Sequence, residues 1–352
     1  MTRSRGYHSY RGRTPKWKVV LAIVLVLVIL GAVGFMVLQE HIVYDGTGTP
    51  HLRLPQQETE DTGTPPEEEE PVEVVIQEPE GPQEIHAFSL PAQALTQQTV
   101  EAALAQPQAE CNAVAVTLKD SAGLVYFDAA GAVSGTVRTE ADTTAALEAL
   151  TGQEDLYTVA RISCFHDPKA ANAEVESMGL KNTGGYIFYD GNNSQWLDPG
   201  HEKARTYLLN IIREAVEQGF REIILTDVSY PTAGKLDKID FSNAMTAGNT
   251  AEAGRQVQIE GFLREVRDAL PKNVILSLEL PAETILAGTN SDAGQELGAL
   301  APLVDRIYAE TTEAEAPALE TAVKAASAAC GFVPELTEQP AEGTENWLLI
   351  QK

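Results

Sequence analysis

Acidic side chains stand at the ends of several apolar runs that have the character of buried strands. Such side chains gather where parallel strands end, which is the edge at which barrel enzymes do their chemistry. Paired carboxylates at such an edge can act as a general acid together with a nucleophile or a general base. The carboxylates in such positions are Asp120, Asp227, Glu279, Glu310 and Glu335. We predict a catalytic role for Glu279 first, as general acid or nucleophile, then for Asp227 and Asp120.

The direction of Glu279 follows from the alternation of its strand. Side chains of a barrel strand point alternately outward and inward. The outward set in Val274–Leu280 is apolar, so Ser277 and Glu279 point inward. The same alternation turns Lys119 and Arg161 toward the interior. These charges then line one mouth, where Arg161 could orient a carboxylate or bind a substrate anion. The alternative is a buried ion-paired cluster that fills the barrel.

Other residue types that support catalysis or metal binding show no useful spacing. Cys111, Cys164 and Cys330 are far apart and odd in number, which favours buried free thiols over a disulfide framework. The histidines show no metal-ligand spacing and form no Cys-His or Ser-His-Asp arrangement. No Gly-x-Gly-x-x-Gly follows the first expected strand, so a dinucleotide site has no support. We therefore predict no metal site and no cofactor.

Strand-like and helix-like segments alternate from Glu84 onward, which predicts parallel pairing. The expected strands are Ile85–Leu90, Ala113–Lys119, Leu156–Ser163, Glu222–Val228, Val274–Leu280, Arg306–Glu310, Cys330–Leu336 and Trp347–Gln351. The expected helices are Thr96–Ala105, Thr139–Leu150, His201–Gln218, Ala253–Ala269, Asp292–Leu303 and Glu313–Ala328. This pattern predicts an α/β fold of the (β/α)8 TIM-barrel type. The last crossover, Thr337–Asn346, is too short and proline-rich for a normal helix, so we expect an irregular last unit. An open doubly wound sheet is the alternative.

An ordered set of motifs resembles a bacterial family of (β/α)8 barrels grouped with glycoside hydrolases and long catalogued as a domain of unknown function. The motifs are Asn112–Asp120, Val159–Pro168, Trp196–Pro199, and Arg221–Pro231 followed by Lys235–Phe241. The resemblance covers roughly Glu84 to Lys352. It implies substrate-binding roles for the following residues, with Trp196 either stacking on a sugar ring or packing in its loop: Lys119, Arg161, Asp167, Trp196, Asp198 and Tyr230.

Two departures from the family pattern leave the activity open. Thr117 and Thr226 stand where the family usually carries an Asp, and Ser229 replaces an Arg. Asp227 is one position along, so alternation turns it away from the mouth unless the strand bulges. The chain is then either a glycoside hydrolase acting on carbohydrate polymer or a degenerate barrel that binds glycan or a protein partner. A purely structural envelope component is a third possibility.

The N-terminal region predicts a membrane anchor. Residues 19–38 form an uncharged apolar run long enough to cross a bilayer, and six basic residues with no acid precede Val19. No small-x-small cleavage site follows, which favours an uncleaved anchor over a signal peptide. We predict a cytoplasmic tail (1–18), a transmembrane helix (19–38), a disordered acidic stalk (39–83) and an extracytoplasmic barrel (84–352). Within the stalk, the alternation in Glu40–Leu54 predicts either a strand or local packing. The formal net charge of −26 argues against nucleic acid as a partner.

Overall fold

The computed structural model describes residues 42–44, 50–52, 84–105 and 111–350. The predicted tail (1–18), transmembrane helix (19–38) and most of the predicted stalk lie outside these residues. Within the described part of the chain, no helix is both long and apolar enough to cross a membrane. The chain divides into two compact units, residues 1–74 and 75–352. In the first, β1 (Ile42–Tyr44) pairs antiparallel with β2 (Pro50–Leu52), as the local alternation predicts.

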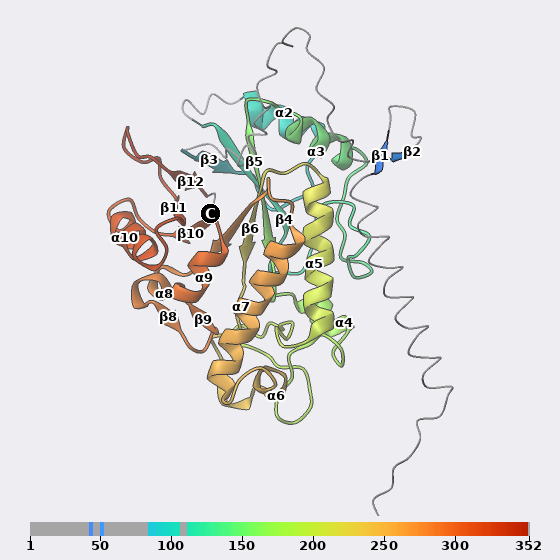
Figure 1. The fold of residues 1–352 in the computed structure, drawn as a ribbon, viewed down its shortest axis with the longest axis vertical. Coiled ribbons are helices and arrows are strands. Elements are labelled where there is room, and N and C mark those ends of the chain that lie inside the picture. The colour runs from blue at the N-terminus through green and yellow to red at the C-terminus, as the bar shows by residue number, and fades with distance from the viewer. Residues whose placement is uncertain (1–41, 45–49, 53–83, 106–110, 351–352) are drawn as a thin grey trace, which may run out of the picture. The chain divides into compact units, whose positions relative to one another are not determined.

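The second unit is a closed barrel of eight parallel strands (Figure 1). The strands are β3 (His86–Ser89), β4 (Ala113–Lys119), β5 (Tyr157–Ser163), β6 (Glu222–Thr226), β7 (Ile275–Glu279), β10 (Arg306–Glu310), β11 (Gly331–Leu336) and β12 (Trp347–Leu349). The last strand, β12, pairs in parallel with the first, β3, and so closes the ring. The predicted barrel and its eight strand positions are confirmed, and closure excludes the open doubly wound sheet.

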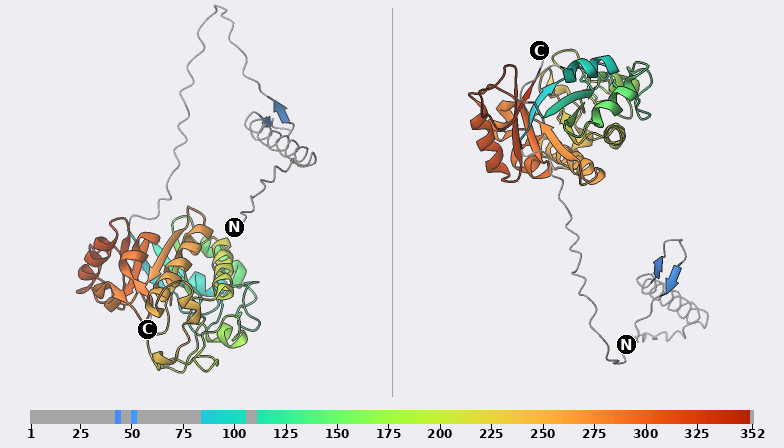
Figure 2. Two further views of the ribbon diagram at one scale, coloured as in Figure 1. Left: turned by 60° about the horizontal axis from the view of Figure 1, so that its bottom comes forward. Right: turned by 90° about the horizontal axis from the view of Figure 1, so that it is seen from above.

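Helices lie outside the ring of strands in both views of Figure 2. They are α2 (Gln97–Ala105), α3 (Thr143–Thr151), α4 (Pro168–Ala173), α5 (Glu202–Glu217), α6 (Ser242–Met245), α7 (Ala251–Ala269), α8 (Ala282–Ala287), α9 (Leu297–Leu300) and α10 (Ala316–Ala326), with 3-10 turns η1 (Leu236–Lys238) and η2 (Ala301–Leu303). The boundary after α5 follows from Gly219, whose φ of +91° is a backbone conformation that glycine adopts without strain.

One predicted helix, Asp292–Leu303, is wrong over its first half. There β8 (Thr289–Asn290) and β9 (Gln295–Glu296) form an antiparallel hairpin. Gly294 has φ +74°, and the buried Gln295 amide donates to the backbone oxygen of Val228. A tertiary hydrogen bond and a glycine turn therefore override the local helical pattern.

The predicted alternation is confirmed for the apolar residues of β4 and β5 inside and outside the barrel. The outward residues Val114, Val116 and Leu118 pack with the helices, and the interior is a separate apolar cluster that includes Ala115 and Val159. The N-terminal end of the barrel is filled by a polar network around Glu222, which has no exposed surface. Glu222 accepts hydrogen bonds from Ser277, Arg306 and Tyr308. This paired network seals one end and leaves the C-terminal end as the opening.

The last crossover is irregular, as predicted. Residues 337–346 contain bends and turns but no helix. A cavity of about 530 Å³ lies beside it, between α10, β11 and residues 344–346. The helix layer is therefore interrupted on this flank.

Candidate active site

A cavity of about 450 Å³ opens at the C-terminal ends of the strands. In Figure 1 this is the end of the barrel nearest α4 and α6, which follow β5 and β6. Its polar lining residues include Thr117, Asp120, Arg161, Ser163, Thr226, Asp227, Glu279, Glu310 and Glu335. We call it the mouth cavity. It brings together all three predicted catalytic residues.

The centre of the mouth cavity is an ion-paired cluster of Arg161, Glu279 and Glu335. Nη2 of Arg161 donates to Oε2 of Glu279 and also to Oε1 of Glu335. The three residues come from β5, β7 and β11, all from inward positions near the strand ends. The side chain of Glu279 is 32% exposed and that of Glu335 only 3%. Glu279 is thus the member of this carboxylate pair that faces the opening.

Burial and mutual repulsion favour the protonated forms of the carboxylate pair. Burial raises the pKa of Glu335 to about 8, and the charges of Glu279 and Glu310 add to the effect against the attraction of Arg161. The pKa of Glu279 is raised too, first by burial and then by Asp227 and Glu310, again against Arg161. Two carboxylates that share one guanidinium hold a proton between them more readily than either would alone. The pair therefore retains a proton to higher pH than an exposed carboxylate would.

This cluster predicts a pH dependence of stability. The folded protein binds the Glu335 proton more tightly than the unfolded chain does, because the pKa rises from 4.5 to about 8 on folding. The resulting stabilisation is complete below the unfolded pKa and is lost as the pH rises through the folded pKa. As the pH rises from 4.5 to 8, we expect the free energy of unfolding of Glu335→Gln to increase relative to that of the wild type. Urea unfolding at several pH values measures this, with the exposed Glu338→Gln as the matched control. If the free energies of unfolding of the wild type and Glu335→Gln differ by the same amount at every pH, this prediction is contradicted.

Asp227 reaches the mouth cavity through an unusual backbone conformation. Strand β6 ends at Thr226, and Asp227 has φ +53°, one of two positive values among the described non-glycine residues. Its Oδ2 accepts a 2.6 Å hydrogen bond from Ser163 Oγ and a 3.3 Å bond from Thr226 Oγ1. The alternation pattern turned Asp227 away unless the strand bulged. The left-handed backbone at Asp227 acts as a bulge would and turns its carboxylate toward the mouth cavity. Such backbone conformations cluster at functional sites.

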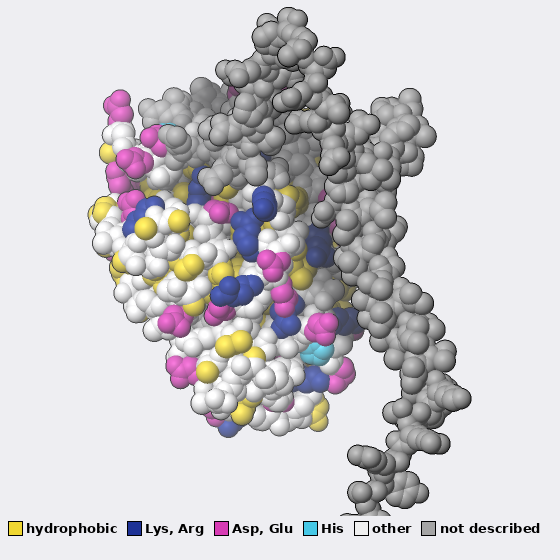
Figure 3. Space-filling view, viewed as in Figure 1, with side chains coloured by type: hydrophobic (Ala, Val, Ile, Leu, Met, Phe, Trp, Pro, Cys, Tyr) yellow, Lys and Arg dark blue, Asp and Glu magenta, His cyan; other side chains and the backbone are white. Residues whose placement is uncertain are grey.

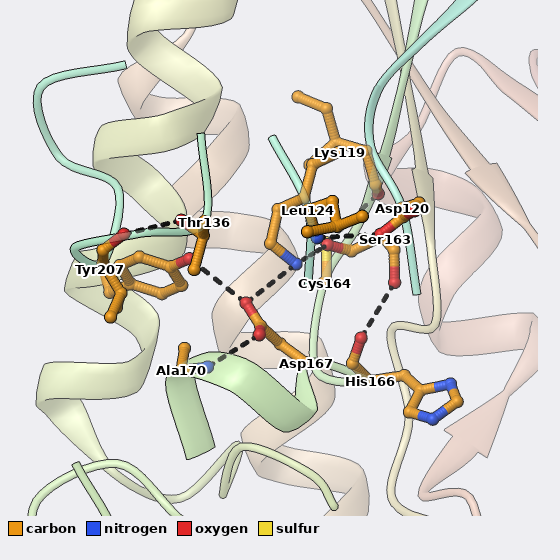
Figure 4. Close-up of polar contacts among 12 residues, drawn as sticks. Lys119, Asp120, Leu124, Thr136, Ser163, Cys164, His166, Asp167, Ala170 and Tyr207 are labelled. Atoms are coloured by element: carbon orange, nitrogen blue, oxygen red, sulfur yellow. Dashed lines mark hydrogen bonds and ion pairs between the residues drawn. The ribbon is translucent and has the colours of Figure 1, made fainter. Parts of the chain in front are cut away.

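Lys119 and Asp167 form a buried ion pair beneath the mouth cavity (Figure 4). Neither side chain has exposed surface, and Nζ of Lys119 lies 3.0 Å from Oδ2 of Asp167. The ammonium also donates to the backbone oxygen of Ser163 at 2.7 Å. Asp167 further accepts from the backbone nitrogen of Ala170, which caps α4, and from the hydroxyl of Tyr207. All of these groups are satisfied within the protein.

The prediction that Lys119 points into the mouth is therefore wrong, for a reason in the backbone. The pairing of β4 with β5 shifts register between Thr117 and Lys119, so that Lys119 lies opposite Ile162. Ile162 belongs to the outer core. A β-bulge of this kind turns the following side chain to the other face. The alternative of a buried, paired charge is the one that the structure bears out for Lys119.

Asp120 lines the mouth cavity, but its carboxylate also organises the loop after β4. Oδ1 accepts from the backbone nitrogens of Ala122 and Leu124, and Oδ2 accepts from the hydroxyl of Tyr126. Burial and the neighbouring Asp120 raise the pKa of Tyr126 to about 12. With both oxygens engaged, Asp120 is less available for proton transfer than the carboxylate pair.

Trp196, Asp198 and Tyr230 lie outside the mouth cavity. The indole of Trp196 is buried, stacks on His166 at 4.4 Å between ring centroids, and donates to Asp190. The carboxylate of Asp198 is bound by the Asn243 amide and the Gly200 nitrogen, and its burial raises the pKa. Tyr230 is fully buried beside Phe241. The predicted stacking of Trp196 on a sugar has no support in this geometry, and loop packing accounts for the residue.

Glu335 is a site residue that the sequence argument does not single out from the other strand-end carboxylates. The alternation that indicates an inward position for Glu279 also applies to β11, where Val333 and Glu335 point inward and Phe332 outward. The three cysteines are free, as predicted, and burial raises the pKa of the Cys164 and Cys330 thiols. Among the described residues, no three His, Cys, Asp or Glu side chains lie close enough to hold a metal ion.

Comparison with solved structures finds many matching chains. A hypothetical protein from Ruminiclostridium thermocellum is 26% identical, with 53% of this chain and 96% of that chain covered and a TM-score of 0.42. An inactive mutant of a Vibrio harveyi GH20 exo-β-N-acetylglucosaminidase is 10% identical, with 76% of this chain and 45% of that chain covered and a TM-score of 0.47. The glycoside hydrolase domain of PelA from Pseudomonas aeruginosa is 14% identical, with 72% and 83% covered and a TM-score of 0.39.

The chain spans less than half of the Vibrio chain. No curated protein matches it. The profile of a protein family described as "Putative glycosyl hydrolase domain" matches residues 88–309. This match covers more than half of the sequence and runs from β3 to β10, so that β11 and β12 follow it. The chain therefore belongs to this family of glycosyl hydrolase-like barrel domains.

Proposed function

We propose that this protein is a glycoside hydrolase that cleaves a carbohydrate polymer in the mouth cavity. The observation that carries the proposal is the carboxylate pair, Glu279 and Glu335, bridged by Arg161 at the open end of the barrel. Two acidic groups whose surroundings hold one proton between them are what acid-catalysed cleavage of a glycosidic bond needs. Membership of the family supports the same reaction class.

The roles within the pair follow from burial and charge. Glu335 is the more buried carboxylate, so it holds the proton and donates it to the leaving-group oxygen as the bond to the anomeric carbon breaks. Glu279 is more exposed and attacks the anomeric carbon, forming a glycosyl-enzyme ester. Glu335, now ionised, takes a proton from water, and the resulting hydroxide equivalent hydrolyses the ester. Each group then returns to its starting state.

The spacing of the pair favours retention of configuration. Both carboxylates bond the same nitrogen of Arg161, so their oxygens are too close together for the roughly 6.5–9.5 Å that inverting enzymes need to accommodate a water. Retaining enzymes keep their carboxyl groups about 5–5.5 Å apart. The proposal therefore includes a covalent intermediate on Glu279.

Asp227 bears on the competing function, a barrel that binds glycan without cleaving it. The missing acid at Thr226 favours that alternative. However, the left-handed backbone at Asp227 returns a carboxylate to the same part of the mouth cavity. The cavity therefore keeps an acidic group near one of the two positions where threonine replaces the usual acid of the family. This favours a catalytic function over binding alone.

The test of the proposed function is product release from a panel of polysaccharides and oligosaccharides by the full chain in mild detergent. Reducing-end sugars and the anomeric configuration of the first product are measured by NMR. Cleavage with retention supports the proposal, and cleavage with inversion overturns the assignment of Glu279 as nucleophile. Binding without product from any member of the panel would make the barrel a glycan-binding module.

We further propose that residues 19–38 anchor the protein in a membrane, with the barrel outside the cytoplasm. The support is the uncharged apolar run and the basic flank that precedes it. We expect the full chain to sediment with membranes, to resist extraction by high salt and to be released by detergent. The chain lacking residues 1–38 should remain in the supernatant. Recovery of the full chain in the salt wash would contradict the anchor, and protease access to the barrel in intact cells would test the orientation.

A further inference from the structure

The charges that line the mouth cavity are strongly unbalanced. Among the described residues, five acidic residues line it, Asp120, Asp227, Glu279, Glu310 and Glu335, against two basic ones, Lys119 and Arg161, and the side chain of Lys119 points away from it. The ammonium of Lys119 is matched by Asp167, which is not a lining residue, and it has no exposed surface. Arg161 is bonded to two of the five carboxylates at once. The cavity therefore keeps an excess of negative charge even when the carboxylate pair holds one proton.

The charge lining the mouth cavity is more one-sided than the charge on the face over α5 and α7. Over α5 and α7 the basic side chains lie among acidic ones (Figure 3), and the two helices are joined by the ion pair of Arg205 with Glu265. A concave site lined by charge of one sign concentrates ligands of the opposite sign. A carboxylate-bearing sugar would meet repulsion in this cavity, and the two basic residues among its described lining are already ion-paired.

A metal ion does not account for this excess of charge. No three acidic or other ligand side chains of the described residues converge on one point as a metal site requires. The carboxylates instead surround a space of about 450 Å³, in the size range of sites for small organic ligands. A positive group that is carried by the ligand itself fits such a distribution, because it interacts with several carboxylates at once without having to be coordinated by them.

We propose that the substrate is a polymer of amino sugars whose amino groups are free and cationic, and that the mouth cavity selects them over N-acetylated, neutral and acidic sugars. The selection rests on the proposed function, since it describes the substrate of the same site. Glu310, at the exposed tip of β10, is the residue that we assign to recognition of the ammonium group, in addition to the carboxylates that take part in cleavage.

The experiment compares oligosaccharides that differ only in charge. Glucosamine, galactosamine and mannosamine oligomers are prepared with free and with acetylated amino groups, and a uronic acid oligomer is included. Binding to full-length Glu335→Gln is measured by calorimetry, and cleavage is measured with the wild type. We expect the free amine form of at least one backbone to bind at least tenfold more tightly than its acetylated form. This preference should shrink as NaCl is raised from 50 to 500 mM, because salt screens the charge.

A pair of variants separates charge recognition from other effects. Glu310→Gln should weaken binding of the free amine severalfold and lower the ratio between the affinities for the free and the acetylated forms. Glu338→Gln makes the same change at an exposed position outside the mouth cavity and should alter neither. Tighter binding or faster cleavage of an acetylated, neutral or acidic sugar would overturn the amino-sugar inference and leave the proposed hydrolase intact. Failure of every sugar to bind or react would overturn both.

Discussion

Replacing Glu335 with Gln is expected to lower kcat for glycoside cleavage by about 10²–10⁴-fold, the usual range for loss of a general acid. Gln keeps the size of the side chain and can still accept the hydrogen bond from Arg161, but it cannot donate a proton to the leaving oxygen. Binding of the substrate should change much less than kcat. Steady-state kinetics of the wild type and the variant measure both quantities.

The leaving group distinguishes proton donation from a merely structural effect. A nitrophenolate departs without protonation, so Glu335→Gln should recover most of its rate of glycosyl-enzyme formation on a nitrophenyl glycoside. Glu279→Gln should lose activity on both kinds of substrate, because the nucleophile is needed for either. Glu338→Gln is the matched control and should behave as the wild type. An equal loss on both substrates for Glu335→Gln would show that Glu335 is not the proton donor.

The largest effect on stability is expected from Lys119→Met. Removing the ammonium leaves the carboxylate of Asp167 charged and buried beneath the mouth cavity, with no cation beside it. Breaking a buried ion pair in this way costs about 3–5 kcal/mol. Asp167 also caps α4 and binds the hydroxyl of Tyr207, so it cannot move to solvent without losing those bonds. The free energy of unfolding in urea measures the loss.

Two further variants show whether charge is the cause. Lys119→Met with Asp167→Asn removes both charges and keeps an oxygen that can accept from Ala170, so it should be more stable than Lys119→Met alone. Lys169→Met changes an exposed lysine close by and should alter stability by less than about 0.5 kcal/mol. If the double variant is no more stable than the single one, lost packing of the lysine side chain explains the effect instead.

The fold was predictable because its signals are local and repeated. Each strand is a short apolar run that ends in polar residues, and the inward position of Glu279 follows from the alternation within a single strand. That rule holds only while the pairing stays regular. The bulge between Thr117 and Lys119 turned Lys119 outward, and nothing in the types of the neighbouring residues announces it.

The mouth cavity was only partly predictable, for the same physical reason. The side chain of Asp227 depends on one backbone angle, which the pattern of residue types does not determine. Glu335 was accessible to the alternation argument, but its high pKa comes first from burial in the folded barrel and then from Glu279 and Glu310, which are distant in sequence. The role of Trp196 depended on whether a loop residue faces a cavity or its neighbour His166, and the tertiary structure decides that.

The interrupted helix layer has a consequence for how the barrel assembles. Strand β12 is held to β11 by two residue pairs and to β3 by three, and the pairing of Trp347 with His86 joins the two ends of the domain in sequence. Contacts between such distant residues form late in folding, because the loop that they close is long. Glu335 itself pairs with Leu348 across this seam. The proposed proton donor thus has β12 as one of its two neighbouring strands, and we expect activity after refolding to recover only once this last strand has docked.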